Sequence, residues 1–398
     1  MTCTERLQDA AGWLLLVVLG LNLRPMLSSV SPLLAEIRSA TGMGFQTAAL
    51  LTTLPVICMG LVALLGNRLG VLGERRGIAL GLSLIAAACL ARLLCGQAGP
   101  LLATALLGGA GVALIQAFLP GVIKHRFEGR VALAMGVYSA SLMGGGGLAA
   151  LFSPLLAHHF EHWQVGLGFW LVPACLALLL WLLWPLAGSA SEAAGRASSF
   201  LRQRRAWLLA LYFGLVNCGY MSMVAWLPAY YLQLGWSPTR SGSLLAFMTI
   251  FQVLAALLMP ALAQSQVDRR PLLSVSLLAQ GFGFVGLVWL PLEYSTLWVA
   301  LIGFGLGACF ALSLILTLDH RQDPREAGQL AAFVQGVGFL INAVSPWLSG
   351  WLRELTGSFV SAWVVLAVTV VLMLGVTRLF NPASYRTQGL GKPALEPG

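Results

Sequence analysis

Uninterrupted apolar runs recur along the whole of this 398-residue chain, and short polar loops separate them. A helix needs about 20 apolar residues to cross the hydrocarbon layer of a bilayer, and these runs reach that length. Only 9% of the residues are charged, against about a quarter in soluble domains, which excludes a water-soluble fold. An outer-membrane barrel is excluded too, because its strands alternate apolar and polar residues. We therefore predict an all-α integral membrane protein.

The longest apolar runs predict twelve transmembrane helices. A polar stretch rich in Gly, Ser and Ala divides them into two sets of six. We predict an N-terminal six-helix half over 1–187, a cytoplasmic linker over 188–205, a C-terminal six-helix half over 206–380 and a cytoplasmic tail over 381–398. The predicted spans are 12–35, 45–66, 77–95, 101–123, 131–156, 165–187, 206–232, 239–263, 271–292, 296–318, 328–352 and 357–380.

Lysine and arginine residues are divided unequally between the two ends of the predicted bundle. Eighteen lie in the loops and tails on the side of the termini, four lie on the opposite side, and Arg24 completes the total of 23. Because cytoplasmic loops of membrane proteins are enriched in these residues, we expect both termini in the cytoplasm. This distribution explains the net charge of +9, so we expect no nucleic-acid partner.

The two predicted halves repeat one another. A shift of 194 residues aligns 74–76 with 268–270, and a shift of 195 aligns Asn22 with Asn217. Two halves of six spans and the same polarity are typical of transporters with a substrate site between the halves, near the bilayer midplane.

Arg24 lies near the middle of the first span, where an arginine costs about 2.5 to 3.5 kcal/mol to insert. In one interpretation the residue is structural, and its guanidinium binds backbone carbonyls, one of which the ring of Pro25 frees. In the other, a diffusible anion binds it. Ser28, four residues on, is then expected to add a hydroxyl on the same helix face.

Two features of the chain favour the anion. Every Asp and Glu falls in a loop, a tail or the end of a span, so Arg24 has no obvious counter-ion within the membrane. An unpaired charge in a low dielectric attracts an anion, and a planar guanidinium suits small planar or linear ones. The repeat sets Gly219 opposite Arg24, so we expect one bound anion rather than two equivalent sites.

Few other polar side chains fall deep within the spans. Asn217 and Tyr220 are three residues apart, and Gln335 and Asn342 are seven apart, so each pair shares a helix face. Such groups either contact a substrate or form hydrogen bonds between helices. We predict a substrate site that comprises Arg24, Asn22, Ser28, Gln116, Tyr138, Ser139, Asn217, Tyr220, Gln252, Gln335 and Asn342.

The twelve spans, the central linker and the basic turns after the second and eighth spans resemble the major facilitator superfamily. Within it, four segments resemble the cyanate permease group, whose relatives include nitroimidazole exporters. These are Gly-Leu-Asn-Leu-Arg-Pro at 20–25, the stretch 106–127, Ser-Ala-Ser-Leu-Met-Gly-Gly-Gly-Gly at 139–147 and Ala-Trp-Leu-Pro-Ala at 225–229. The resemblance implies alternating access, a cavity lined by the first, second, fourth and fifth spans and their repeats, and a bacterial inner membrane. We expect a monomer without a cofactor.

The loop 66–77 occupies the position of the superfamily's cytoplasmic signature, and 264–270 occupies that of its repeat. The family pattern has an aspartate where Gly70 and Gln264 stand, so the usual charge relay is incomplete here. Neighbouring charges either replace this gating latch or only determine topology. The predicted gating residues are Glu74, Arg75, Arg76, Asp268, Arg269 and Arg270.

Many proton-coupled members of the superfamily use an Asp or Glu within the membrane. Because the spans of this chain contain none, we expect facilitated diffusion, anion exchange, or symport in which the proton travels with the substrate or on another group. His158, His159 and His162 have spacing that suits a metal, but a solvated rim is favoured, so we predict no metal site. No Walker loop, nucleophile elbow or HExxH motif is present, so we expect no enzyme.

Three functions are compatible with these features. The first is a secondary active or facilitative transporter that moves a small anion, cyanate or a similar species, by alternating access around Arg24. The second is an exporter of 2-nitroimidazole-like or other small drugs, in which Arg24 is structural and aromatic residues line the pocket. The third is a non-transporting membrane sensor. We favour the first.

Overall fold

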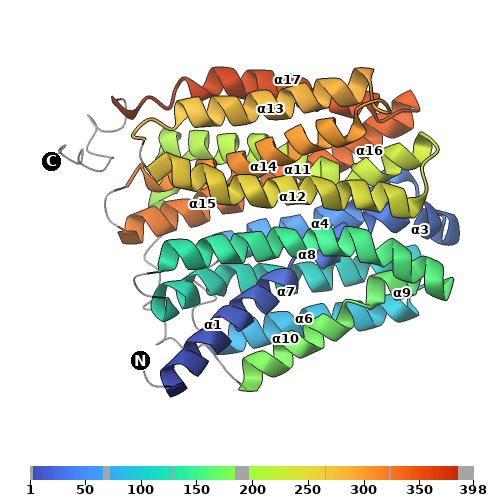
Figure 1. Ribbon diagram of the computed structural model, residues 1–398, viewed down its shortest axis with the longest axis horizontal. Coiled ribbons are helices and arrows are strands. Elements are labelled where there is room, and N and C mark those ends of the chain that lie inside the picture. The colour runs from blue at the N-terminus through green and yellow to red at the C-terminus, as the bar shows by residue number, and fades with distance from the viewer. Residues whose placement is uncertain are drawn as a thin grey trace.

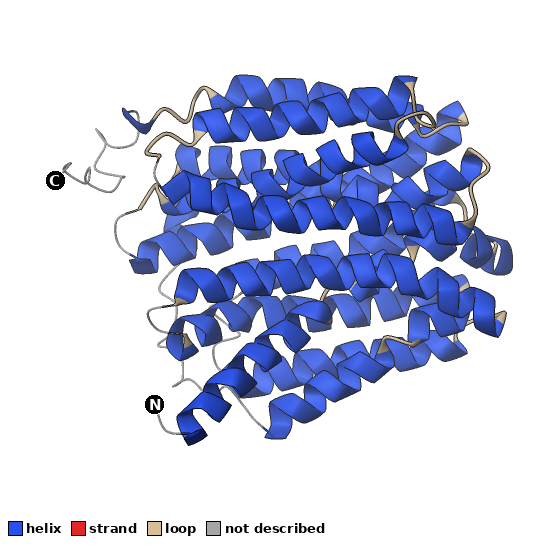
Figure 2. Ribbon diagram, viewed as in Figure 1, coloured by secondary structure: helices blue, strands red, loops and turns tan. Residues whose placement is uncertain are grey.

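The computed structural model describes residues 3–65, 72–127, 130–183, 197–264, 266–321 and 324–383. Over these residues every regular element is a helix (Figure 2), and twelve helical segments are long and apolar enough to cross a membrane. The predicted all-α membrane architecture is therefore confirmed. α1 begins and α17 ends at the same end of the bundle (Figure 1). We call this the terminal end and the opposite one the far end.

The N-terminal half contains the first six spans. Its helices lie together in the lower part of Figure 1. The first span is divided into four short elements, and the sixth into two. The elements of this half are α1 (Cys3–Leu21), α2 (Pro25–Ser28), η1 (Ser31–Leu33), α3 (Leu34–Thr41), α4 (Phe45–Leu64), α6 (Glu74–Leu94), α7 (Ala98–Arg126), α8 (Val131–Phe160), α9 (Trp163–Gly168) and α10 (Leu171–Leu183).

The C-terminal half contains the other six spans. Its eleventh span is divided into two helices, which meet at Ala343. The elements of this half are η3 (Ala197–Arg202), α11 (Arg204–Gln233), α12 (Pro238–Gln264), α13 (Arg270–Trp289), α14 (Ser295–Leu318), α15 (Pro324–Asn342), α16 (Val344–Thr356) and α17 (Val360–Thr377).

The linker and tail predictions fall largely outside the described residues, which exclude 184–196 and 384–398. Residues 197–202 of the predicted linker form η3, and Phe200 in it is buried, with its ring 6.2 Å from that of Phe333 in α15. The last part of the linker therefore packs onto the C-terminal half.

The first span departs from the continuous helix expected over 12–35. α1 ends at Leu21, and a four-residue helix follows from Pro25. Proline has no N–H to donate, and its ring clashes with the carbonyl four residues upstream, here that of Leu21. Pro32 then lies within the 3₁₀ turn η1. Two prolines within one span thus interrupt the helix around Arg24 and leave backbone groups there without hydrogen bonds inside the helix.

Burial follows the position of each span in the bundle. In the most apolar stretch of α11, 78% of the residues are buried, against 33% in α17. α11 is therefore central, whereas α17 is peripheral. Large apolar side chains such as Val371 and Leu372 of α17 are exposed, as expected of a helix face in contact with lipid.

The two halves meet mainly along two pairs of spans, the fifth with the eighth and the second with the eleventh. α8 packs against α12, and α4 packs against α15 and α16. Glycines allow the close approach: a Cβ added to Gly147 of α8 would lie 3.2 Å from Thr249 of α12, and one on Gly60 of α4 would lie 2.8 Å from Leu340 of α15. Small residues at such contacts let helix backbones come together in a membrane.

At the far end, polar and aromatic contacts join the halves. The backbone N–H of Gln46 donates to Oε1 of Glu354 at 3.1 Å. The ring of Phe45 lies 5.8 Å from the rings of both Trp226 and Phe359. Phe45, which belongs to the N-terminal half, is thus inserted into an aromatic cluster of the C-terminal half.

Candidate functional site

A small cavity lies between the two halves. It is lined by residues of both halves, and its lining divides into a cationic and polar part and an apolar part. The lining residues are Arg24, Met143, Asn217, Tyr220, Met221, Gln252, Leu306, Phe310, Phe339 and Asn342.

Arg24 contributes the only positive charge among the described residues of this lining. Its side chain is 4% exposed, and its guanidinium carbon lies 4.9 Å from the ring centroid of Tyr220 in α11. Nε and Nη1 have no hydrogen-bond partner among the described residues. A cation over an aromatic ring gains about 0.5 to 2 kcal/mol, but the ring leaves these N–H donors unpaired. The geometry therefore offers two donors to an anion.

The break in the first span fixes the position of Arg24. Arg24 is the N-cap of α2, and its carbonyl accepts hydrogen bonds from the N–H groups of Leu27 and Ser28. α8 reaches the break because of its glycine run: a Cβ on Gly145 would lie 2.2 Å from the carbonyl oxygen of Leu21. The broken backbone thus lies directly against a helix that also contacts the other half.

A second arginine, Arg92 of α6, lies behind this break and was not among the predicted site residues. It is fully buried, in contrast to the position at the solvated end of the third span on which the topology count relied. Its Nη1 donates to the carbonyl of Met26 in α2, and its Nε donates to Oγ1 of Thr104, both at 3.2 Å. Arg92 therefore satisfies a carbonyl that the short helix α2 leaves free.

The C-terminal half supplies amides on the opposite wall. Nδ2 of Asn217 donates to the carbonyl of Phe213 at 2.7 Å. Asn342 is 1% exposed, and its Oδ1 has no partner among the described residues. Gln252 of α12 is 2% exposed. Since an unpaired buried polar atom costs about 1 to 3 kcal/mol, Asn342 and Arg24 are the groups that gain most from a ligand.

Five of the predicted substrate-site residues line this cavity: Arg24, Asn217, Tyr220, Gln252 and Asn342. The other six lie elsewhere in the described structure. Nδ2 of Asn22 donates to the carbonyl of Val18 at 2.8 Å, within α1. Ser28 is buried against Gly146 of α8.

The remaining four predicted residues are also placed outside the lining. Tyr138 is buried in α8, and its hydroxyl and the side chain of Gln116 contact each other close to Arg24. Ser139 and Gln335 are partly buried in α8 and α15. The role of all eleven residues in substrate binding stays a prediction.

The apolar lining residues Met143, Met221, Leu306, Phe310 and Phe339 were not predicted. Apolar residues occur throughout every span, so their identity does not distinguish a cavity wall from a lipid-facing or packed surface. For Met221, its position next to Tyr220 was the one available signal.

The predicted gating charges lie at the terminal end. Residues 66–71 of the signature loop and the side chain of Gln264 lie outside the description. Glu74 is buried at the start of α6, whereas Arg75 and Arg76 are exposed. A Cβ on Gly121 of α7 would lie 2.7 Å from Oε1 of Glu74.

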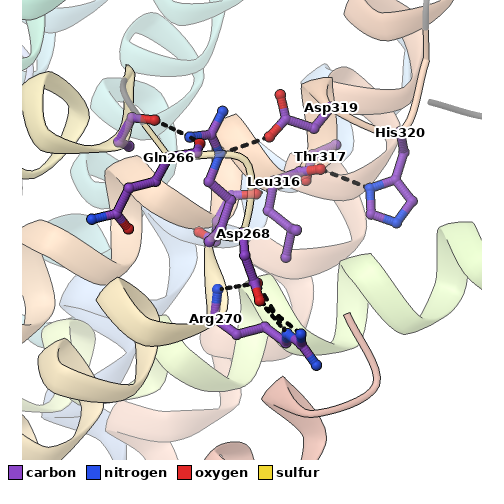
Figure 3. A network of polar contacts seen from close by, with 10 residues as sticks. Gln266, Asp268, Arg270, Leu316, Thr317, Asp319 and His320 are labelled. Carbon is purple, nitrogen blue, oxygen red and sulfur yellow. Dashed lines mark hydrogen bonds and ion pairs between the residues drawn. The ribbon is translucent and has the colours of Figure 1, made fainter. Parts of the chain in front are cut away.

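The charges of the repeat form ion pairs within the C-terminal half (Figure 3). Nη2 of Arg270 lies 2.7 Å from Oδ2 of Asp268, and Nε of Arg269 lies 2.8 Å from Oδ2 of Asp319. The hydrogen bond from Arg270 holds the pKa of Asp268 below its ordinary value. The Arg269–Asp319 pair connects the α12–α13 loop with the end of α14, whereas the Asp268–Arg270 pair is local to the start of α13. The role of these charges in gating stays a prediction.

The model of the Major Facilitator Superfamily matches residues 16–346. The chain is 48% identical over 375 residues to the cyanate transport protein CynX of Escherichia coli (strain K12), covering 94% of this chain and 97% of that protein. It is 30% identical over 382 residues to the 2-nitroimidazole transporter of the same organism, covering 94% and 96%. The crystal structure of the D-xylose-proton symporter superposes with a TM-score of 0.75 at 14% identity, covering 92% of this chain and 97% of that one, and shows the same fold.

These similarities confirm the resemblance found in the sequence motifs. The family match covers most of the chain, and both relatives are similar over nearly all of it. Both relatives are transporters, which agrees with the expectation that the chain is not an enzyme. The chain, whose described residues include twelve helical segments able to cross a membrane, therefore belongs to the major facilitator superfamily of membrane transporters.

Proposed function

We propose that this transporter carries cyanate or a similar small anion across the bacterial inner membrane by alternating access around Arg24. The main observation behind this proposal is Arg24, a residue 4% exposed that lines the cavity between the halves. Two nitrogens of its guanidinium have no hydrogen-bond partner among the described residues. The similarity to a cyanate transport protein supports the same substrate.

Physical chemistry gives the bound anion two effects. An ion within the cavity would neutralise a charge that otherwise costs several kcal/mol to hold in a low dielectric. It would also lie between the halves, because Arg24 belongs to the first span and most of the other lining residues belong to the C-terminal half. Binding therefore favours a closed state around the ion, from which either end can open.

The far-end contacts supply one gate of this cycle. For the cavity to open at the far end, Phe45 has to leave the cluster of Trp226 and Phe359, and Gln46 has to leave Glu354. The proposal takes the terminal end as cytoplasmic, in line with the excess of basic residues there. We propose a monomer as the working unit, since each chain contains both halves.

Export of a nitroimidazole is the second candidate function. It is favoured by the five apolar residues of the lining and by the similarity to a 2-nitroimidazole transporter. A neutral ring would stack on the apolar wall and leave Arg24 as a structural residue. No specific observation favours the third hypothesis, a membrane sensor.

The two candidates are separated by uptake of labelled cyanate into proteoliposomes. If an anion binds Arg24, Arg24→Ala abolishes uptake and Arg24→Lys loses most of it, because the planar fork is lost. The matched control is Arg378→Ala, at an exposed position beyond α17, which keeps wild-type uptake. Full uptake by Arg24→Ala would contradict the site.

The nitroimidazole candidate is tested in cells. If export is the function, cells that express the wild-type protein resist 2-nitroimidazole, and cells that express Arg24→Ala resist it equally. Resistance that requires Arg24 would show that the charge acts on the drug as well.

A further inference from the structure

Two residues of the cavity lining, Arg24 and Asn342, have buried polar atoms without a hydrogen-bond partner among the described residues, and these atoms have opposite hydrogen-bonding character. Arg24 can only donate, and Oδ1 of Asn342 can only accept. Arg24 is 4% exposed and Asn342 1% exposed, and both line the same cavity. One simple ion that only accepts hydrogen bonds satisfies the first group and leaves the second unpaired.

Both groups lie at interruptions of a transmembrane helix. Arg24 lies between α1 and α2, and Asn342 is the last residue of α15, next to Ala343, where the eleventh span is divided. Interrupted helices place polar groups at the substrate sites of membrane transporters. The two interruptions belong to different halves, so a ligand that satisfies both bridges the interface.

Asn217 provides a second amide oxygen in the C-terminal half that can accept a hydrogen bond. Nδ2 of Asn217 donates to the carbonyl of Phe213. Because a carbonyl accepts hydrogen bonds only, this bond fixes the orientation of the amide and directs its Oδ1 elsewhere. Asn217 lines the cavity as well. Two amide oxygens of the C-terminal half, those of Asn217 and Asn342, can therefore accept a hydrogen bond, whereas Arg24 of the N-terminal half only donates.

We propose that the cavity prefers small oxyanions that also carry a hydrogen-bond donor, of which hydrogen carbonate is the simplest. Its charged oxygens accept from Nε and Nη1 of Arg24, and its O–H donates to Oδ1 of Asn342. This inference rests on the proposed function, since it assigns a substrate class to the same site. It also gives a route for a proton through a membrane interior without acidic residues, because the proton stays on the substrate.

Nitrate provides the matched control for hydrogen carbonate. Both ions are planar, trigonal and singly charged, and only hydrogen carbonate has an O–H group. Nitrate is the less strongly hydrated of the two, so an apolar cavity with one arginine would select nitrate. A site with an unpaired acceptor rejects the ligand that lacks the donor. The two explanations thus predict opposite orders of affinity.

The experiment is inhibition of labelled cyanate uptake into proteoliposomes at pH 8, with hydrogen carbonate or nitrate as the competitor. We expect hydrogen carbonate to inhibit at a concentration at least about tenfold lower than nitrate, the factor that follows from one unpaired buried acceptor. Equal inhibition, or stronger inhibition by nitrate, would overturn the inference. This comparison uses the wild-type protein and does not depend on the folding of a variant.

Asn342→Leu then tests the acceptor itself. We expect the preference for hydrogen carbonate over nitrate, measured as the ratio of their affinities for the purified protein in calorimetry, to disappear. Asn381→Leu, the same substitution at an exposed position, keeps the preference. A preference that survives in folded Asn342→Leu would overturn the role of this oxygen.

Direct binding to the purified protein separates failure of this inference from failure of the proposed function. If hydrogen carbonate binds more tightly than nitrate in calorimetry but the protein carries no cyanate, the substrate proposed above is wrong and the inference stands. If cyanate is carried and nitrate binds as tightly as hydrogen carbonate, the inference is wrong and the proposed function stands.

Discussion

The first and seventh spans occupy equivalent positions in the two halves but are built differently. The first is broken around Arg24, whereas the seventh is the continuous 30-residue helix α11. At Gly219, the repeat counterpart of Arg24, a Cβ would lie 2.6 Å from Nε2 of Gln280 in α13. One half thus places a cation at a helix break, and the other fills the same position with a neutral amide from a neighbouring helix.

The supporting helices differ in the same way. Arg92 in α6 binds the backbone of the broken first span from behind, whereas Gln280 in α13 packs against the unbroken α11. A broken helix exposes carbonyls that need donors, and a continuous helix does not. The N-terminal half is therefore built around a buried positive charge at the cavity. The C-terminal half is a more conventionally packed wall that supplies amides.

The largest effect is expected where α8 contacts the break. A Cβ on Gly145 would lie 2.2 Å from the carbonyl oxygen of Leu21, a backbone atom that cannot move without displacing α1. We expect Gly145→Val to abolish the folded protein, measured as the monodisperse fraction in size-exclusion chromatography. The matched control is Gly144→Ala, whose Cβ would lie 3.8 Å from Cδ2 of Leu21 and should leave the yield unchanged. A folded Gly145→Val would show that α8 and the break are not tightly coupled.

Arg92→Met should reduce transport without much loss of stability. Nη2 of Arg92 has no partner among the described residues, and replacing a buried charge by an apolar side chain is often neutral for stability. The carbonyl of Met26 loses its donor, so we expect the orientation of Arg24 to relax and the KM for cyanate to rise about tenfold, equivalent to one hydrogen bond to a charged group. Arg92→Lys keeps a positively charged hydrogen-bond donor at this position, so its affinity for cyanate should lie between those of Arg92→Met and the wild type. If the KM for cyanate is unchanged in a folded Arg92→Met variant, Arg92 contributes to packing and not to the orientation of Arg24.

A pH effect is expected at the terminal end of the C-terminal half. His320 is 2% exposed, and burial lowers the pKa of its imidazole from 6.5 to about 4. Its Nδ1 lies 2.7 Å from the carbonyl of Leu316, and its Nε2 accepts from Nε of Arg205 at 3.1 Å. Both contacts suit the neutral ring with its hydrogen on Nδ1.

The sign of this effect follows from proton linkage. Between pH 6.5 and 4 the unfolded state binds a proton that the folded state does not, so stability falls as the pH is lowered, by at most about 1.4 kcal/mol per pH unit. The thermal midpoint in detergent should therefore drop across this range. His320→Gln, which retains an amide donor and acceptor, should show a flatter profile. Identical slopes for the two proteins would remove His320 as the cause.

The twelve transmembrane helices could be predicted from the sequence because the composition of a long apolar run is enough to identify a membrane span. The sequence did not predict the break in the first span, although Pro25 and Pro32, which interrupt a regular helix, were the available signal. It did not reveal Arg92, because an arginine near the end of an apolar run ordinarily extends to the interface. Which face of a span turns toward the cavity depends on helix rotation. Spans that are apolar all round do not encode this rotation, so Phe310 and Phe339 were missed, and Asn22, predicted with Arg24, lies outside the cavity lining.

The smallest effect is expected from Gln280→Leu, the C-terminal counterpart of the Arg92 experiment. Oε1 of Gln280 is buried without a partner among the described residues, so its removal relieves an unpaired acceptor. Because α11 needs no donor from α13, we expect the KM for cyanate to change by less than about threefold, within the range of about 0.5 kcal/mol seen for changes that touch no binding group. The thermal midpoint should stay equal or rise. A KM shift as large as that of Arg92→Met would contradict the asymmetry between the halves, because it would show that the seventh span also depends on the helix behind it to place the substrate.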